Sequence, residues 1–306
     1  LEPERVDEIV FGCANQAGED NRNVGRMAGL LAGLPTSVPA TTLNRLCGSS
    51  LDAAMVASRA IALGEADVCV VGGVESMSRA PWVLPKTEKP YPVGGLELAS
   101  TTLGWRLVNR LMPGEWTVSL GEATELLRER HGISRERQDD FAARSHRLAA
   151  QAWAAGFYAD QVVAVLGVEL AQDESIREGT SVERLAGLKP SFRPAETGTV
   201  TAGNASPLND GASAALLGSA AAAELTGLAP IARIAGRGVA AGDPQFFGFA
   251  PVEAANRALE RAGISWADVD AIELNEAFAA QALACTDAWG VDLEIVNRHG
   301  GAIAIG

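Results

Sequence analysis

Apolar and polar positions in the first quarter of the chain follow alternating strand and helix patterns. Short apolar runs at 6–11, 38–43 and 68–71 predict strands, and the segments 23–34 and 49–63 between them predict helices. The second helix follows from residues at i, i+3, i+4 and i+7 spacing: Leu51, Ala54, Met55, Ser58, Ile61 and Ala62. Alternation of this kind predicts a mainly parallel sheet that is covered by helices.

The pattern changes after residue 78. Five prolines and the pair Gly94-Gly95 predict a long irregular excursion over 79–116, a kind of segment that often forms a lid or a binding loop. Two polar helices are expected at 121–131 and 135–155. A second αβ pattern then follows, with strands at 231–239 and 269–274 and helices at 251–262 and 278–289. The sequence therefore predicts two αβ halves separated by a loop-rich insert.

Composition excludes several classes of protein. The 306 residues carry a net charge of −13, which argues against a nucleic-acid-binding protein but leaves room for a local basic pocket. The longest apolar stretch, 214–223, is shorter than the roughly 20 residues of a membrane span, so no membrane association is expected. The four cysteines form no Cys-x-x-Cys pair, and the three histidines lack metal-ligand spacing. We expect a reduced, cytoplasmic chain without a metal site.

Cys47 is the strongest candidate for chemistry. If a helix begins near Gly48 or Ser49, the thiol faces the helix N-terminus, where unpaired N–H groups and the helix dipole stabilise a thiolate. This is the setting of an activated nucleophile on a sharp turn. The alternative is a small buried cysteine, which is the commoner role of an unpaired cysteine. The other three cysteines lie inside strand or helix patterns.

Three further segments have two interpretations each. Asn275 and Glu276 follow a predicted strand, where αβ sheets place ligands, although an asparagine there often caps the next helix. The small residues of 300–306 could pack tightly or expose N–H groups to an anion. The polar loop 199–206 is compatible with turn chemistry or with the wall of a pocket for an amide-bearing ligand.

Five segments, in this order along nearly the whole chain, resemble the thiolase family: Asn44-Arg45-Leu46-Cys47-Gly48-Ser49, Gly72-Gly73-Val74-Glu75-Ser76-Met77-Ser78, Gly198-Thr199-Val200-Thr201-Ala202-Gly203-Asn204-Ala205-Ser206, Asn275-Glu276-Ala277-Phe278-Ala279 and Gly300-Gly301-Ala302-Ile303-Ala304-Ile305-Gly306. The resemblance implies an α/β fold with a five-layer αβαβα architecture of two similar mixed-sheet halves. The N-terminal half would comprise 1–78 and 198–227, and the C-terminal half 228–306. The inserted loop domain, 79–197, would bind CoA.

The resemblance also implies an activity. Thiolases are acyltransferases that cleave a 3-oxoacyl-CoA with CoA into acetyl-CoA and a shortened acyl-CoA, and they run the reverse condensation. CoA and acyl-CoA are substrates, and no cofactor is bound permanently. A homodimer or homotetramer is implied, with the strand beside Cys69 as an interface.

Roles for single residues follow from the same resemblance. Cys47 would carry the acyl group as a thioester, and its backbone N–H would serve one oxyanion hole. Asn275 would hold a water in another oxyanion hole. The CoA-binding positions would be Arg177, Arg184, Ala202, Ser206 and Phe278. For both arginines the alternative is an ordinary solvated surface charge.

The chain departs from the family pattern in three places. The family's opening Arg-Thr-Pro strand is missing, and its catalytic histidine and second cysteine would both lie beyond Gly306. We therefore expect a longer gene that encodes His-Pro after Gly306, and no turnover from residues 1–306 alone. His299 precedes the glycine pair and is a poor substitute for the base. His131 and His146 are expected at the surface of polar helices.

Three segments bear on the substrate. Ser119-Leu120 and Phe247 replace residues that are typical of short-chain biosynthetic members, and Thr101-Thr102-Leu103-Gly104-Trp105-Arg106 resembles thiolases of aromatic-acid breakdown. These features favour a degradative enzyme with 3-oxoadipyl-CoA as the candidate substrate. The alternatives are an acetoacetyl-CoA-forming biosynthetic thiolase and a non-catalytic acyl-CoA- or lipid-binding relative. A ketosynthase is disfavoured, because it would need a His-Gly-Thr type of motif where this chain has Asn275-Glu276-Ala277-Phe278.

Overall fold

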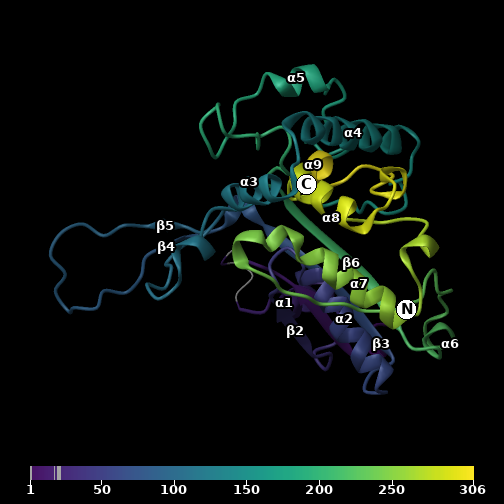
Figure 1. The fold of residues 1–306 in the computed structure, drawn as a ribbon. Coiled ribbons are helices and arrows are strands. Elements are labelled where there is room, and N and C mark those ends of the chain that lie inside the picture. The colour runs from purple at the N-terminus through teal and green to yellow at the C-terminus, as the bar shows by residue number, and fades with distance from the viewer. Residues whose placement is uncertain (1, 17, 19–21) are drawn as a thin grey trace. The chain divides into compact units, whose positions relative to one another are not determined.

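The computed structural model describes residues 2–16, 18 and 22–306 and divides into two units, each of which is described by itself (Figure 1). The first unit comprises Leu1–Leu107 and Leu208–Ile234. The second comprises Val108–Pro207 and Ala235–Gly306. Each unit is therefore built from two separate stretches of the chain.

A four-stranded mixed sheet is the centre of the first unit. Its strands are β1 (Glu8–Gly12), β2 (Ala40–Leu43), β3 (Val68–Ser76) and β6 (Asp210–Gly218), in the order β2-β1-β3-β6. β1 runs parallel to β2 and β3, as the sequence predicts, whereas β6 pairs antiparallel with all nine residues of β3. Sequence analysis missed β6, because its alanines, glycines and Ser213 lack the β-branched residues that usually indicate a strand.

Helices cover both faces of this sheet. Val10 and Val71 pack against Ala53 and Ala57 of α2 (Ser49–Ala62). Neighbouring strand residues point the other way, where Ile9 joins a cluster with Ala28 of α1 (Val24–Leu31). Successive side chains along a strand point to opposite faces of the sheet, so each strand contributes to both clusters. Both predicted helices are thus confirmed, and Asn23 caps α1 by accepting a hydrogen bond from the Arg26 N–H at 3.0 Å.

The strand that carries Cys69 lies in the interior of this sheet. β1 pairs with one edge of β3, and β6 pairs with the other. Because the backbone donors and acceptors of β3 are already used in the sheet, its edges are not free, and the interface at the strand beside Cys69 stays a prediction.

The excursion after β3 is irregular, as predicted. It contains the short helix η2 (Met77–Arg79) and a two-stranded ribbon of β4 (Trp82–Val83) and β5 (Ala99–Ser100). In Figure 1 the residues between β4 and β5 form a long loop. The remaining elements of the first unit are η1 (Pro3–Arg5) and α6 (Ala222–Thr226).

The second unit is mainly helical. Its helices are η3 (Gly114–Trp116), α3 (Leu120–His131), α4 (Arg135–Ala154), α5 (Val182–Ala186), η4 (Pro244–Phe249), α7 (Ala250–Ala262), η5 (Trp266–Asp268), α8 (Ala279–Trp289), η6 (Leu293–Ile295) and α9 (Ala302–Ile305). Nine residues of α8 are buried, and their neighbours in the core include Leu127 of α3, Phe141 of α4 and Ile303 of α9. The four long helices, α3, α4, α7 and α8, match the predicted ones to within two residues at each end.

The two strands predicted in the last quarter of the chain are wrong. Residues 231–239 pair with no strand in the described part of the chain. Instead, its second half bonds to α7: Arg257 donates to the carbonyl of Val239 at 2.8 Å, and Arg261 donates to that of Arg237 at 2.7 Å. In 269–274 a single parallel bridge joins Ile272 to Val296. Apolar runs alone cannot tell a strand from an extended segment whose backbone bonds to a helix.

Candidate active site

Cys47 lies on the turn between β2 and α2, as predicted, and its side chain is exposed. The preceding residue, Leu46, has a φ of 51°, a left-handed conformation that is costly for a branched side chain. Ser49 holds the turn together, because its hydroxyl accepts from the Arg45 N–H at 2.8 Å and donates to the Leu46 carbonyl at 2.6 Å. The buried-cysteine alternative is therefore wrong for Cys47, which sits on a tight, strained turn.

Two glycines bring the start of α2 close to the sheet. A Cβ atom on Gly12, at the end of β1, would lie 2.4 Å from the Ser49 carbonyl carbon. A Cβ atom on Gly73, in β3, would lie 2.2 Å from Ser50 Oγ. Side chains at these positions would push the helix away, so the glycines fix where the Cys47 turn sits above the strand ends.

The thiol of Cys47 is less acidic than the sequence led us to expect. Although Cys47 is accessible at the surface, the protein around its thiol displaces enough water to raise its pKa above the ordinary value of 9.0. The Cys47 backbone N–H lowers the pKa by less than this desolvation raises it, and the negative charge of Glu75 adds a smaller rise. Glu75 is held in place by the N–H groups of Ala14 and Asn15, at 2.8 and 3.0 Å. The position at a helix start therefore does not bring the pKa of this thiol below its ordinary value.

Asn275 belongs to the second unit, and its side chain is exposed. Helix α8 begins four residues later, at Ala279, with Phe278 in the capping position. The alternative in which Asn275 caps the following helix is therefore wrong. Its amide remains available for a ligand.

The polar loop 199–206 contacts the segment that carries Asn275. The Ser206 N–H and hydroxyl both donate to the Ala277 carbonyl, at 3.1 and 3.2 Å. Ala205 forms a backbone bridge with Phe278, and the Ala279 N–H donates to the Asn204 carbonyl at 2.9 Å. The structure thus brings two predicted CoA-binding residues, Ser206 and Phe278, beside the Asn275 segment. Ala202 is exposed on the same loop.

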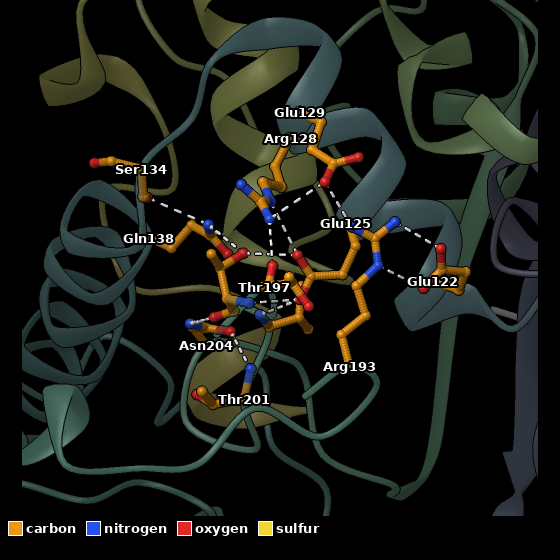
Figure 2. A network of polar contacts seen from close by, with 12 residues as sticks. Glu122, Glu125, Arg128, Glu129, Ser134, Gln138, Arg193, Thr197, Thr201 and Asn204 are labelled. Atoms are coloured by element: carbon orange, nitrogen blue, oxygen red, sulfur yellow. Dashed lines mark hydrogen bonds and ion pairs between the residues drawn. The ribbon is translucent and has the colours of Figure 1, made fainter. Parts of the chain in front are cut away.

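A buried carboxylate, which sequence analysis missed, anchors the start of this loop (Figure 2). Glu125 of α3 is fully buried and accepts hydrogen bonds from the N–H groups of Thr199 and Val200 at 2.6 and 2.8 Å. It also accepts from the Thr199 hydroxyl at 2.9 Å and from Arg128 Nε at 3.0 Å. Burial acts to raise the pKa of Glu125, but these hydrogen bonds outweigh it and hold the pKa below its ordinary value.

A second buried acid holds the far end of the loop. Asn204 donates to Asp139 of α4 at 2.9 Å, and its side-chain oxygen accepts from the Thr201 N–H at 2.8 Å. Figure 2 shows Asn204 and Thr201 on the loop below Gln138, which donates to the Thr199 hydroxyl at 3.1 Å. The loop is therefore held at both ends by buried acids of α3 and α4. The signal in the sequence was an acid on the buried face of a predicted helix.

The two predicted CoA arginines lie on the surface of the second unit. Arg177 is exposed, and its backbone N–H donates to His146 Nδ1 at 3.3 Å. Arg184 is exposed in the middle of α5, and its guanidinium donates to the Gly179 carbonyl at 2.7 Å. The prediction that His146 lies at the surface is wrong, because it is buried in α4, where desolvation lowers its pKa.

Other reactive groups give no second centre. Cys13, Cys69 and Cys285 are buried, and none of the four cysteines forms a disulfide. Within residues 2–16, 18 and 22–306, no three His, Cys, Asp or Glu side chains cluster as metal ligands. Among the helices that the structure describes, none has the length and apolar character needed to cross a membrane.

Two family models match the chain. The model described as the thiolase N-terminal domain matches residues 1–221, and the thiolase C-terminal domain matches residues 228–306. The chain is 50% identical to the 3-oxoadipyl-CoA/3-oxo-5,6-dehydrosuberyl-CoA thiolase of Escherichia coli, with all of this chain and 78% of the relative covered. It is 49% identical to the beta-ketoadipyl-CoA thiolase of Pseudomonas putida, over 99% of this chain and 77% of that protein.

Solved structures agree with these matches. Human mitochondrial 3-ketoacyl-CoA thiolase in complex with CoA is similar over all of this chain and 76% of its own, with a TM-score of 0.92 and 36% identity. The acetyl-CoA acetyltransferase of Bacillus anthracis gives a TM-score of 0.90 and 39% identity, over all of this chain and 77% of its own. These similarities confirm the predicted α/β fold class.

Proposed function

Because this chain belongs to the thiolase family and is therefore an acyltransferase, we propose that it cleaves 3-oxoadipyl-CoA, or a 3-oxoacyl-CoA with a similar terminal carboxylate. The proposal rests on sequence identities of 50% and 49% to two proteins whose names state this substrate. One name gives it as 3-oxoadipyl-CoA, and the other uses the synonym beta-ketoadipyl-CoA. CoA is the second substrate, and no permanently bound cofactor takes part.

Cys47 is the proposed nucleophile. Its thiolate attacks the 3-oxo carbon of the substrate, the bond between C2 and C3 breaks, and C2 leaves as an acetyl-CoA carbanion that takes up a proton. The acyl group remains on sulfur as a thioester, and the thiolate of CoA then removes it and restores Cys47. The exposed thiol on its strained turn supports this role. Its raised pKa means that the reaction needs a base to take the thiol proton.

Asn275 is proposed to hold the water that donates in an oxyanion hole. Its exposed amide lies on a segment whose neighbours Leu274 and Ala277 both make backbone hydrogen bonds. A donor that is held in place before the reaction is worth about 3 kcal/mol in the transition state. The loop that carries Ala202 and Ser206, together with Phe278, would guide the pantetheine arm towards it.

An exposed cation near the Cys47 turn supports a substrate with a second carboxylate. Arg106 donates to the side-chain oxygen of Asn15 at 3.2 Å. Asn15 also donates to the carbonyl and the hydroxyl of Thr101, at 2.9 and 3.0 Å. The loop of Asn15 is joined to the Cys47 turn, since Asn44 donates to the Ala14 carbonyl at 2.8 Å. A guanidinium held there could pair with the distal carboxylate of the substrate.

The test of the proposed function is a comparison of substrates. The protein expressed from its complete gene is assayed for thiolysis with 3-oxoadipyl-CoA, a long-chain 3-oxoacyl-CoA and acetoacetyl-CoA. We expect kcat/KM for 3-oxoadipyl-CoA to exceed that for acetoacetyl-CoA by at least about tenfold. A preference for acetoacetyl-CoA would instead support the biosynthetic alternative, which the similarity to the Bacillus anthracis acetyl-CoA acetyltransferase keeps open. Tight binding of acyl-CoA without thiolysis would indicate a non-catalytic relative.

A mutation of Arg177 tests the CoA site. The Arg177 side chain is exposed, so its guanidinium can reach a phosphate. We expect Arg177→Ala to raise KM for CoA about fivefold, the effect of one exposed charge pair, with kcat within twofold. Arg147→Ala, which removes another exposed arginine from α4, is the control and leaves both constants unchanged. Equal effects of the two variants would contradict the assignment.

We also propose a cytoplasmic homodimer or homotetramer, as the family resemblance implies. The absence of disulfides among the four cysteines is usual in a reducing compartment.

A further inference from the structure

Glu276, the residue after Asn275, is a fully buried carboxylate in the second unit. Its desolvation raises its pKa, and hydrogen bonds from Ser145, Asn297 and Ile303 act against that rise. A buried carboxylate without partners would be strongly destabilising, so its surroundings must supply donors. The partners of Glu276 come from three different segments of the chain.

One carboxylate oxygen binds α4 and the glycine-rich C-terminal segment. Glu276 Oε2 accepts from the Ser145 hydroxyl at 2.7 Å and from the Ile303 N–H at 3.1 Å. Ser145 in turn accepts from the Gly301 N–H at 3.1 Å. A Cβ atom on Gly301 would lie 2.3 Å from the Glu276 carboxyl carbon. The glycine at 301 is therefore required for the close approach of this carboxylate, and the N–H groups of this segment serve an internal anion.

The other oxygen binds Asn297, which also fixes the residue before Asn275. Glu276 Oε1 accepts from Asn297 Nδ2 at 2.8 Å. The same amide donates to the Leu274 carbonyl and accepts from the Leu274 N–H, both at 2.8 Å. Asn297 makes these contacts from a left-handed backbone conformation, with a φ of 46°, which asparagine adopts more readily than most residues.

Asn275 thus lies between two anchored residues. Leu274 is held by Asn297, and Glu276 is held by α4 and the C-terminal segment. We propose that Glu276 is a positioning residue that holds the backbone from which Asn275 places the oxyanion-hole water at the thioester oxygen. The proposal rests on the proposed thiolase role of Asn275. Glu276 touches no reacting atom in this scheme; it acts through the geometry of its neighbour.

Glu276→Gln tests the proposal with almost no change in volume. The amide keeps one acceptor but turns an NH₂ group towards a donor, so at least one of the three hydrogen bonds is lost. In the protein from its complete gene, we expect kcat for thiolysis to fall about tenfold, with KM for CoA within twofold, because the acyl step and not CoA binding depends on Asn275. Glu273→Gln is the matched control: the same substitution at an exposed glutamate three residues earlier leaves kcat unchanged.

Ser145→Ala is a milder variant, which removes one donor to Glu276 and keeps the test possible if Glu276→Gln does not fold. We expect it to lower kcat about threefold with an unchanged KM for CoA. A kcat within 1.5-fold of wild type in both folded variants would overturn the proposal. A fall in kcat that disappears at a temperature where both proteins are fully folded would overturn it too, since Glu276 would then act on stability alone.

Hydrogen exchange distinguishes a failure of the Glu276 proposal from a failure of the proposed function. Amides of residues 274–277 and 301–303 should exchange faster in Glu276→Gln than in wild type, whether or not the wild type turns over a thioester. If the wild type shows no thiolysis but exchange increases, Glu276 still holds this backbone, and it is the thiolase role of Asn275 that fails. If exchange at these amides is unchanged, Glu276 is not a positioning residue, whatever the activity.

Discussion

Cys47→Ala is expected to abolish thiolysis, with kcat reduced by at least about 10³-fold. The substitution removes the only atom on which the acyl group can be carried in the proposed mechanism, and losses of this size follow removal of a catalytic nucleophile. The exposed position of Cys47 predicts little effect on folding. The measurement is the steady-state rate with 3-oxoadipyl-CoA, together with the thermal unfolding midpoint, which we expect to shift by less than about 2 °C.

Cys69→Ala is the matched control, because Cys69 belongs to the same unit but is buried and has no proposed role. We expect it to retain activity within about threefold. A Cys47→Ala protein that keeps a tenth or more of the wild-type rate would contradict the assignment of the nucleophile.

Alkylation by iodoacetamide examines the same thiol without substrate. Cys47 should be the cysteine that reacts in the native protein, since the other three are buried, and acetyl-CoA should protect it. Only the thiolate reacts, and desolvation and Glu75 raise the thiol pKa above 9.0. With the thiol pKa above 9.0, the rate of alkylation should increase about tenfold for each pH unit up to about pH 9. A rate that levels off near neutral pH would show that a base or cation outside these contacts acts on the thiol.

The first unit shows how far local patterns reach. The apolar runs predicted β1, β2 and β3 and the helices between them, because each segment has a clear period and clear ends. The Cys47 turn was also predictable, from its place between a strand and a helix. What the sequence could not show was the acidity of the thiol. That depends on desolvation and on Glu75, which is 28 positions away and whose orientation is set by the backbone of Ala14 and Asn15.

The second unit shows where such patterns fail. Residues 231–239 look like a strand, yet part of this segment bonds to arginines of α7 rather than to another strand. The groups that hold the proposed site were invisible for a similar reason. Glu125 and Glu276 each stand beside apolar residues in the sequence, but their roles become recognisable only when distant N–H groups converge on them. A single sequence gives residue types, but long-range hydrogen bonds decide which acid is structural.

The largest effect on stability is expected from Glu125→Gln. The substitution leaves the buried donors of Thr199, Val200 and Arg128 with too few acceptors, and breaking one side of a buried charged cluster costs about 3 kcal/mol. For a unit of this size the unfolding midpoint should fall by about 8 °C. Glu129→Gln is the control: this glutamate lies one turn later on α3 and pairs with Arg193, but it is exposed. We expect its effect to be below about 1 kcal/mol.

The pH dependence of this effect has a definite sign. The pKa of Glu125 is lower in the folded chain than its ordinary value of 4.5, so the unfolded chain binds more protons between the two values. The stabilisation is therefore complete above the unfolded pKa and is lost as the pH falls through the folded pKa. The difference in unfolding free energy between wild type and Glu125→Gln should be constant from pH 8 to 6 and should shrink below about pH 4.5. A difference that grows on acidification would mean that the protonated acid is the form that holds the loop, contrary to the four donors that surround it.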